Sequence, residues 1–494
     1  MGKITPQILV TFLSIKKKPG KTLNAQLYEQ LKKGIYEGML RAADRMPSTR
    51  EMSKELKIAR NIVLEVFEQL KMEGFLSSRT GSGTFISEGV DKLSYLNARV
   101  SNRVAKPLRN VARPLGLNDA FKGHASILEP IRPFQASVPL VPEFPFPLWS
   151  RISAAVYRNI DQLHLGYDDA QGYLPLRKAL SDHLRISRSI KCEPENMLIV
   201  NGSRQAMHLT TEILLNKGDG CWMEDPGYAG ARSAIQRFGG KILPVPVGPD
   251  GIDLKYATRH YPKAKLAYVT PSHQFPMGNT MALNQRIRLL NWARDNNMWI
   301  LEDDYDSEFR YNSRPLAALQ GLDTHQNVIY LGTFSKVLLP ALRLGYMVFP
   351  STEMARQFSI AKSATDGQNN IIEQAIVSEF IKQGHFSRHI RRMRSLYKKA
   401  QDDLVRLIKK HLGKMLMPVP SEAGMHLLGW LPPGSDGELI AREAAKEGLI
   451  VHALSEHGIR FDHKNGLMLG FAGFTYNEME AAVIMLKRVL QKNL

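Results

Sequence analysis

Cysteine is scarce in this chain of 494 residues, which contains only Cys192 and Cys221. Two thiols without metal-ligand spacing predict neither a disulfide framework nor a cysteine-based metal site. Long apolar runs are also lacking, since no stretch approaches the roughly 20 residues of a membrane span. The short apolar stretch from Ile8 to Leu13 precedes three lysines, which is the reverse of signal-peptide order. The composition therefore predicts buried thiols, no membrane span and a cytoplasmic location.

Acidic residues are the second shortage. The chain has 47 Asp and Glu against 66 Lys and Arg, which gives a net charge of +19. Residues 1–130 hold 22 basic and 12 acidic residues, a large share of the excess in a small part of the chain. Neutralisation of nucleic-acid phosphates is one use of such an excess, and solubility alone is the other. The length is too great for one core and predicts two domains joined by a linker.

The segment from Tyr330 to Met347 is the most informative part of the chain. It places Lys336 directly after Ser335, at the end of an apolar run that predicts a buried strand. A desolvated lysine in that position can form a Schiff base with an aldehyde. A serine hydroxyl and a guanidinium nearby can hold a phosphate group. Together these residues predict a pyridoxal phosphate site, and a surface Ser-Lys pair with an ordinary structural arginine is the alternative.

Three further segments support a pyridoxal cofactor. An apolar run ends in Asp303, which could lie beside the ring nitrogen, and Tyr305, which could donate to the phenolate oxygen. Both side chains are expected on the same face of one strand, because alternate residues share a face. Gly202 and Ser203 follow another apolar run and open a helix whose N–H groups would bind an anion. Tyr228 offers a ring that could stack on the pyridine.

With these motifs in this order, residues 131–494 resemble the aminotransferase-like, fold-type I pyridoxal-phosphate proteins. The resemblance implies a large α/β domain with a mostly parallel sheet and a smaller C-terminal α+β subdomain. Members are dimers with sites at the subunit interface, and Tyr167 resembles the tyrosine that reaches the phosphate of the other subunit. Lys336 is implied as the Schiff-base lysine, with cofactor contacts at Gly202, Ser203, Tyr228, Asp303, Tyr305, Ser335 and Arg343.

Two residues depart from the aminotransferase pattern. Phe275 stands where these enzymes usually carry an asparagine, which leaves Tyr305 with less help at the phenolate. Met468 stands where an arginine normally binds the substrate α-carboxylate, and a thioether cannot replace that bidentate fork. An ordinary α-amino acid is therefore a poor candidate ligand. His273 and His426 could approach the cofactor, but single histidines are more often structural, and neither is assigned a catalytic role.

The N-terminal residues predict a separate small domain. Apolar residues recur every four positions from Leu23 to Ile35 and give one apolar helix face. A second helix is entered through Pro47 and Ser48, a third covers residues 60–73, and two short strands follow around a glycine turn. Helix, helix-turn-helix and hairpin together are typical of a winged helix-turn-helix, and a helical protein-docking module is the alternative.

Residues 20–88 resemble the GntR superfamily of winged-helix repressors, on the segments Met46-Pro-Ser-Thr-Arg-Glu51 and Arg79-Thr-Gly-Ser-Gly-Thr-Phe85. The resemblance implies that the recognition helix lies in the major groove of DNA. Ala59 stands where relatives commonly carry serine or threonine, which removes a helix cap. The residues that the resemblance assigns to DNA contacts are Ser48, Thr49, Arg50, Arg60, Asn61, Gly81, Ser82 and Gly83.

A GntR-type winged helix joined to an aminotransferase-like domain resembles the MocR-type regulators, and this resemblance covers nearly the whole chain. Residues 89–130, with six basic residues from Lys92 to Arg113, are expected to form a basic flexible linker. The hypothesis is a regulator that binds double-stranded operator DNA as a head-to-tail homodimer. It senses pyridoxal phosphate, or a small amine or amino-acid effector, through Lys336. The rival hypotheses are an aminotransferase with a secondary DNA-binding domain and a cofactor-free repressor.

Overall fold

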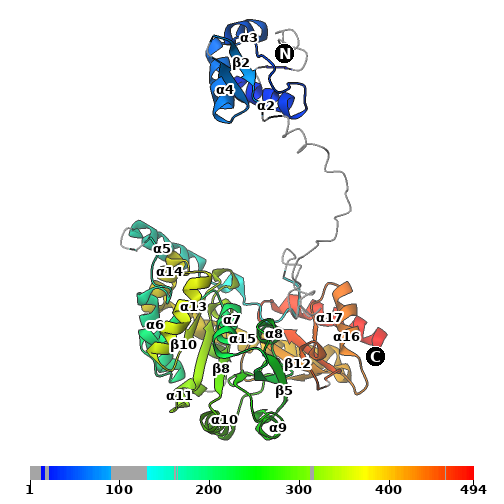
Figure 1. The fold of residues 1–494 in the computed structure, drawn as a ribbon. Helices are drawn as coiled ribbons and strands as arrows, with labels where there is room; N and C mark the ends of the chain where they lie inside the picture. The colour runs from blue at the N-terminus through cyan, green and yellow to red at the C-terminus, as the bar shows by residue number, and fades with distance from the viewer. Residues whose placement is uncertain are drawn as a thin grey trace. The chain divides into compact units, whose positions relative to one another are not determined.

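A computed structural model of the chain describes residues 13–16, 20, 22–79, 81–88, 90, 131–160, 163, 165–311, 316–461 and 463–494. The chain divides into two compact units, Met1–Ala112 and Arg113–Leu494 (Figure 1). The predicted linker lies outside the described residues except for Val90. In the described part of the chain, no helix combines the length and the apolar character that a membrane span requires.

The described part of the smaller unit has the predicted order of helix, helix-turn-helix and hairpin. The antiparallel hairpin pairs Leu76 with Ile86 and Arg79 with Gly83. One apolar core joins the three helices to the hairpin and includes Leu27, Val66 and Phe67. The elements are α2 (Leu23–Tyr36), α3 (Thr49–Leu56), α4 (Arg60–Met72), β1 (Leu76–Arg79) and β2 (Gly83–Ile86).

Helix caps explain where α3 and α4 begin. Ser48 caps α3 and exchanges a capping-box pair of hydrogen bonds with Glu51, as its position before the helix predicts. Lys57 adopts a left-handed conformation with φ 50° and ends α3. Ala59 precedes α4 and provides no capping hydrogen bond, in agreement with the missing serine or threonine.

The larger unit is built on an eight-stranded sheet in the order β3-β10-β9-β8-β7-β4-β5-β6. The neighbours from β5 through β4, β7 and β8 to β9 are parallel, whereas β10 runs antiparallel to β3 and β9, and β6 to β5. Parallel strands present their carboxyl ends at one edge, so the residues after β4, β7, β8 and β9 meet there. The strands are β3 (Met197–Val200), β4 (Gly220–Asp225), β5 (Lys241–Gly248), β6 (Gly251–Ile252), β7 (Leu266–Val269), β8 (Trp299–Asp304), β9 (Val328–Thr333) and β10 (Gly345–Val348).

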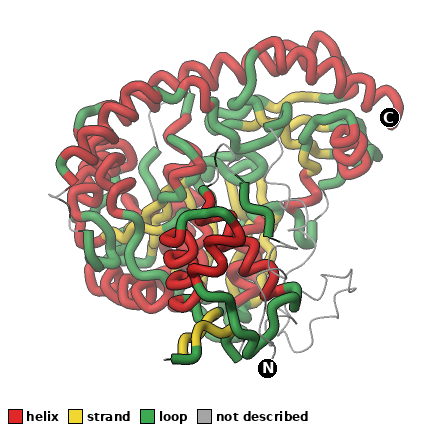
Figure 2. The backbone as a smooth tube through the Cα atoms, turned by 90° about the horizontal axis from the view of Figure 1, so that it is seen from above, coloured by secondary structure: helices red, strands yellow, loops and turns green. Residues whose placement is uncertain are grey.

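Helices lie along the outside of this sheet (Figure 2). Met207, Ile235 and Phe358 belong to one apolar cluster with the sheet, and Trp222 and Ile300 belong to another. Cys192 and Cys221 are buried, as predicted. The first cluster involves α7 (Ser203–Leu214), α8 (Ala229–Arg237) and α13 (Thr352–Thr365), and the second α9 (Leu254–His260), α10 (Leu283–Asp295) and α11 (Leu319–Leu322). Burial on both sides explains why the strands read as continuous apolar runs.

A smaller C-terminal subdomain contains a four-stranded antiparallel sheet in the order β11-β12-β14-β13. Its strands are β11 (Met417–Val419), β12 (His426–Trp430), β13 (His452–Ala453) and β14 (Gly466–Gly470), and its helices are α16 (Gly437–Lys446) and α17 (Tyr476–Asn493). Figure 1 shows this subdomain at the end of the larger unit opposite α5 (Phe146–Arg158), α6 (Leu174–Arg188) and α14 (Ile371–Lys382). The predicted large domain and smaller α+β subdomain are therefore both present.

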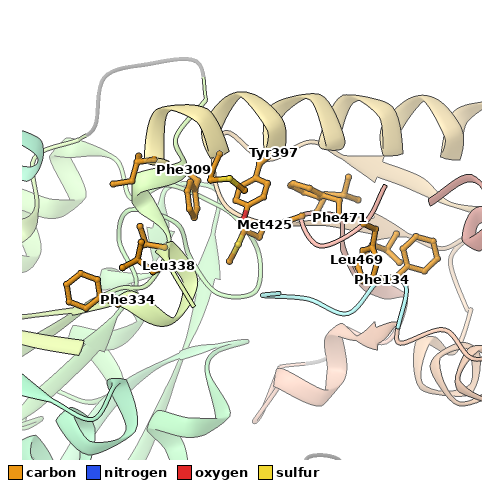
Figure 3. Packing of buried hydrophobic residues seen from close by; sticks show 14 of the residues in the cluster. Phe134, Phe309, Phe334, Leu338, Tyr397, Met425, Leu469 and Phe471 are labelled. Carbon is orange, nitrogen blue, oxygen red and sulfur yellow. The ribbon is translucent and has the colours of Figure 1, made fainter. Parts of the chain in front are cut away.

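A shared apolar core joins the small subdomain to the large sheet. The long helix α15 (His385–His411) runs beside it, and Figure 3 shows Tyr397 pointing from this helix into the cluster. The ring of Tyr397 lies 4.9 Å from that of Phe309, and its hydroxyl oxygen accepts the backbone N–H of Leu140 at 3.1 Å. Phe471 of the small subdomain belongs to the same cluster. This shared core thus fixes the small subdomain next to the carboxyl edge of the large sheet.

Candidate functional site

Lys336 lies in α12 (Phe334–Val337), the short helix that follows β9. Its amino group donates to the backbone oxygen of Ser137 at 3.0 Å. Burial lowers the pKa of Lys336 to about 8, although the carboxylates of Asp306 and Asp303 oppose this shift. A lysine with a lowered pKa has a larger neutral, nucleophilic fraction near neutral pH. Its surroundings therefore suit reaction with an aldehyde.

Asp303, near the end of β8, has one satisfied and one unsatisfied oxygen. Its Oδ2 accepts the hydroxyl of Tyr268 at 2.7 Å, whereas its Oδ1 is buried without a hydrogen-bond partner among the described residues. Burial raises the pKa of Asp303 to about 7. Buried polar atoms are rarely left unpaired, and a carboxylate oxygen in this state fits a cationic N–H such as a protonated pyridine nitrogen.

Tyr305 belongs to a row of polar groups that crosses between the subdomains. It lies just beyond β8, which ends at Asp304, and not on the strand as the alternation of side chains predicts. Its hydroxyl oxygen lies 2.9 Å from His273 Nδ1, and the same nitrogen lies 2.9 and 3.0 Å from the two carboxylate oxygens of Asp306. His273 Nε2 lies 2.9 Å from Ser421 Oγ, which belongs to the small subdomain.

The predicted phosphate contacts come from two segments that approach each other. Gly202 precedes α7 with φ 93°, and Ser203 is the first residue of that helix. Arg343 lines a cavity of about 470 Å³ together with Asn201. A Cβ added to Gly345 would lie 3.1 Å from the Cα of Gly202, so the backbone after Arg343 lies against the start of α7. A helix N-terminus and a guanidinium each suit a phosphate group, and here the two come from neighbouring backbone segments.

The remaining predicted cofactor residues differ in where they lie. Tyr228 precedes α8, and burial raises the pKa of its hydroxyl, on which the charges of Asp303 and Arg343 also act. Ser335 stands beside Lys336 in α12. Tyr167 is 100 % exposed, and its side chain makes no hydrogen bond or ring contact within the described residues. A single chain therefore brings Asp303 near Lys336, Tyr228 and Tyr305, and the start of α7 near the segment after Arg343, whereas Tyr167 is exposed.

Phe275 and Met468, the two departures from the aminotransferase pattern, belong to one group of packed apolar side chains. The ring of Phe275 makes edge contacts with the rings of Tyr228 at 5.8 Å and Tyr305 at 5.9 Å. Met468 is buried on β14 and clusters with Leu428, and Phe275 packs against this cluster. The position that would carry a carboxylate-binding arginine thus packs against apolar side chains, and His452 lies opposite it on β13.

In the smaller unit, most of the predicted DNA-contacting residues are exposed, including Arg50, Arg60 and Asn61 and the wing residues Gly81 to Gly83. Arg60 Nε donates to Thr49 Oγ1 at 3.2 Å, which joins the starts of α3 and α4. Arg45 is absent from the predicted set, yet its guanidinium lies 3.2 Å from the position of a Cβ added to Gly83 at the wing.

Sequence reasoning placed His273 near the cofactor without a role, and it missed both the contact of His273 with Tyr305 and the partners of His273, namely Asp306 and Ser421. Their separation along the chain gives no spacing signal. The usable signal was local: His273 lies two residues before Phe275, within the segment that departs from the aminotransferase pattern. Among the described residues, no three metal-ligating side chains gather in a way that could hold an ion.

Comparisons with known proteins agree with both halves of this description. Residues 145–486 match the family described as aminotransferase class I and II, and residues 23–86 match the bacterial regulatory proteins of the gntR family. The chain is 35 % identical over 465 residues to the probable rhizopine catabolism regulatory protein MocR of Rhizobium meliloti, covering 94 % of this chain and 93 % of that protein. The chain belongs to the MocR-type transcriptional regulators.

This MocR-type regulator is also similar to a second regulator over nearly its whole length and to a solved aminotransferase over its larger unit. It is 29 % identical to the HTH-type pyridoxine biosynthesis transcriptional regulator PdxR of Corynebacterium glutamicum, over 91 % of this chain and 92 % of that protein. Its fold is similar to that of LysN, an α-aminoadipate aminotransferase of Thermus thermophilus solved with N-(5'-phosphopyridoxyl)-L-leucine. The TM-score is 0.69 at 27 % identity, covering 76 % of this chain and 95 % of LysN. The aminotransferase-like domain implies pyridoxal phosphate as cofactor, and Lys336 with the unpaired oxygen of Asp303 fits that group.

Proposed function

We propose that this MocR-type regulator binds operator DNA through its winged helix and senses pyridoxal phosphate, or a small amine, at Lys336. The observation that carries the proposal is a buried lysine with a pKa of about 8 beside Asp303, whose Oδ1 has no hydrogen-bond partner among the described residues. When bound, the cofactor supplies an aldehyde that condenses with amines and an electron-accepting ring. A cytoplasmic location, where operator DNA lies, belongs to the same proposal.

Each predicted residue has a distinct task in this proposal. Lys336 holds the aldehyde carbon, Asp303 accepts the ring N–H, and Tyr305 donates to the phenolate oxygen. Tyr228 covers one face of the ring. The phosphate is held by the start of α7 and by the hydroxyl and guanidinium groups nearby, at Gly202, Ser203, Ser335 and Arg343.

The apolar side chains around Met468 narrow the choice of ligand. The thioether of Met468 cannot give a carboxylate the charge and the two hydrogen bonds that an arginine would give it at this position. We therefore favour pyridoxal phosphate itself as the signal, or an amine that lacks an α-carboxylate. A ligand changes DNA binding only if it favours one arrangement of the two winged-helix domains of the dimer over another.

A head-to-tail homodimer is part of the same proposal. Tyr167 is fully exposed in the single chain, and the apolar residues Phe146, Tyr157 and Leu165 of the preceding segment are exposed as well. A second subunit would cover such side chains and would bring Tyr167 to the phosphate of its partner. For the DNA contacts, the exposure of Arg50 in α3 and of Arg60 and Asn61 in α4 supports a role for the first turns of these two helices.

The direct test is fluorescence anisotropy of the purified apo protein with DNA from just upstream of its own gene. Binding is measured with and without pyridoxal phosphate, and against scrambled DNA at equal salt, because salt alone changes affinity strongly. Sequence-specific binding that changes with the cofactor supports the proposal. Specific binding that is indifferent to the cofactor points to a separate amine effector.

An aminotransferase is the second candidate function, because the lysine, aspartate and tyrosine of that chemistry are all present and the fold is similar to LysN. The discriminating assay follows conversion of amines to carbonyl products with saturating pyridoxal phosphate and an added keto acid that accepts the amino group. Many turnovers per site would contradict a pure sensor. A colourless protein whose Lys336 cannot be trapped by borohydride would instead favour a cofactor-free repressor.

A further inference from the structure

The Nδ1 atom of His273 lies within hydrogen-bond distance of two residues, and these contacts determine which atom is the donor in each hydrogen bond. Asp306 Oδ1 lies 2.9 Å from Nδ1, and Tyr305 Oη also lies 2.9 Å from it. A carboxylate can only accept a hydrogen bond, so with Asp306 ionised Nδ1 carries a proton and acts as a donor. Tyr305 cannot donate to a protonated nitrogen, so its oxygen shares the single Nδ1 proton with Asp306, and its own O–H proton is directed elsewhere.

We infer that His273 is a positioning residue, which donates from Nδ1 and thereby turns the hydroxyl proton of Tyr305 toward the phenolate oxygen of the cofactor. Aminotransferases usually carry an asparagine at the position of Phe275, and a benzene ring has no donor to offer in its place. Burial and the Asp306 carboxylate raise the pKa of Tyr305 well above its ordinary value, so the hydroxyl keeps its proton. The inference rests on the cofactor placement proposed above.

The His273–Asp306 pair is tightly confined by the loop between β11 and β12, which carries Gly424. Both side chains are almost completely buried, at 2 % and 1 % exposure. A Cβ added to Gly424 would lie 2.2 Å from His273 Cε1 and 2.6 Å from Asp306 Oδ2, so only glycine leaves room for the pair. A ring confined in this way has little freedom to turn its Nδ1 donor away from Tyr305.

The same loop of the small subdomain also contacts Nε2 of this ring through Ser421. With Nδ1 protonated, Nε2 of a neutral imidazole accepts the hydroxyl proton of Ser421 at 2.9 Å. Ser421 is itself fixed by Gln401 of α15, whose Nε2 donates to the Ser421 backbone oxygen at 3.0 Å. The position of the small subdomain relative to the large sheet therefore influences the Tyr305 hydroxyl through Ser421 and His273.

Several other ionisable groups face this place and enter any pH measurement. Aspartates 303, 304 and 306 come from the end of β8 and the residues just beyond it, Glu224 from β4, and Lys336 from α12. His426 of β12 lies with its ring 5.4 Å from that of His273, but burial lowers the pKa of His426 to about 3, so it stays neutral at working pH. Nε2 of His426 donates to the backbone oxygen of Pro276 at 3.1 Å, away from Tyr305.

The test is a pH titration of the visible absorption of the bound cofactor in the intact protein. A donor to the phenolate stabilises its ionised form and lowers the midpoint. His273→Gln removes the donor at the Nδ1 position and should raise the midpoint by about one to two pH units. His273→Asn keeps an N–H close to the Nδ1 position and should stay near the unmodified protein. Tyr305→Phe is the positive control, and His426→Gln is the matched buried-histidine control, expected to leave the midpoint unchanged.

Each pattern of results decides a different point. A shift in Tyr305→Phe but not in His273→Gln overturns the positioning role and leaves the proposed cofactor site standing. No shift in Tyr305→Phe overturns the placement of Tyr305 itself. Equal shifts in the Gln and Asn variants mean that lost packing acts instead of the donor, which also overturns the inference.

Thermal melting of the apo protein shows whether each variant folds. Should His273→Gln fail to fold, Ser421→Ala carries the test, because it removes only the hydrogen bond at Nε2. The expected result is a smaller shift in the same direction. An unchanged midpoint in Ser421→Ala overturns the link from the small subdomain to Tyr305.

Discussion

At the scale of single residues, Lys336 combines a buried amino group with a pKa of about 8. Only the neutral amine attacks an aldehyde, and its fraction grows with pH up to the pKa. The rate at which apo protein and pyridoxal phosphate form a chromophore should therefore rise up to about tenfold per pH unit below pH 8 and level off above it. Stopped-flow absorbance measures this rate.

Two variants make that measurement specific. Lys336→Ala should form no chromophore, whereas Lys255→Ala, which changes an exposed lysine, should react like the unmodified protein. A rate that rises only near the ordinary pKa of lysine would show that Lys336 is not desolvated in the way described.

Arg60 is the corresponding single residue of the DNA-binding head. It is exposed at the first position of α4 and donates to Thr49 Oγ1. Arg60→Ala should weaken specific operator binding by roughly 1–3 kcal/mol, or about 5- to 160-fold, and leave the chromophore intact. Anisotropy and absorbance on the same sample measure both, with Arg259→Ala as an exposed arginine control in the larger unit. Loss of the chromophore together with DNA binding would mean that the variant misfolds.

Single residues also show how far sequence reasoning extends. Lys336 and Asp303 could be proposed because each lies near the end of an apolar run, where a buried polar residue needs a special reason. His273 could not, because its partners Asp306 and Ser421 lie 33 and 148 residues away along the chain. Only folding brings them together, and a single histidine in a loop has no periodic pattern to reveal such partners.

At the scale of elements, the loop between β11 and β12 must pass very close to the His273–Asp306 pair. Gly424 has φ 87°, and a Cβ there would lie 2.2 Å from His273 Cε1. Gly424→Ala should therefore lower stability by about 3 kcal/mol, of which roughly 1–2 kcal/mol comes from backbone conformation and the rest from overpacking. Urea unfolding followed by circular dichroism measures the loss.

Gly434 provides a matched control for that prediction. Its φ is 85°, nearly the same as that of Gly424, but a Cβ there would meet nothing within 4 Å. Gly434→Ala should lose only the conformational part of the stability. Equal losses in the two variants would mean that the protein relaxes around the new methyl group at Gly424.

Element order was harder to predict than element identity. The helices of the head could be placed because their caps and apolar periods are local, as at Ser48. The buried strands could also be predicted, because an apolar run is a local pattern. The insertion of β10 antiparallel between β3 and β9 could not be predicted, since β3 lies far from β10 in sequence and pairing order leaves no local mark.

At the scale of the whole molecule, a single chain leaves the proposed cofactor site without Tyr167, which is fully exposed. If the site is composite, Lys336 and Tyr167 of one site come from different subunits. Lys336→Ala alone abolishes the chromophore. Tyr167→Phe alone weakens cofactor binding by about tenfold, which corresponds to one hydrogen bond to phosphate.

Mixing these two variants in one refolded or co-expressed sample separates the possibilities. In a mixed dimer one site carries both substitutions and the other carries neither, so about one quarter of all sites should regain full affinity after random pairing. Absorbance titration with pyridoxal phosphate should then show two phases, the tighter one absent from either variant alone. If Tyr167 instead serves its own chain, every Lys336-containing site still lacks the hydroxyl, and the titration stays in one weak phase. Because the two outcomes differ in the number of phases and not only in strength, partial unfolding of either variant cannot imitate the composite site.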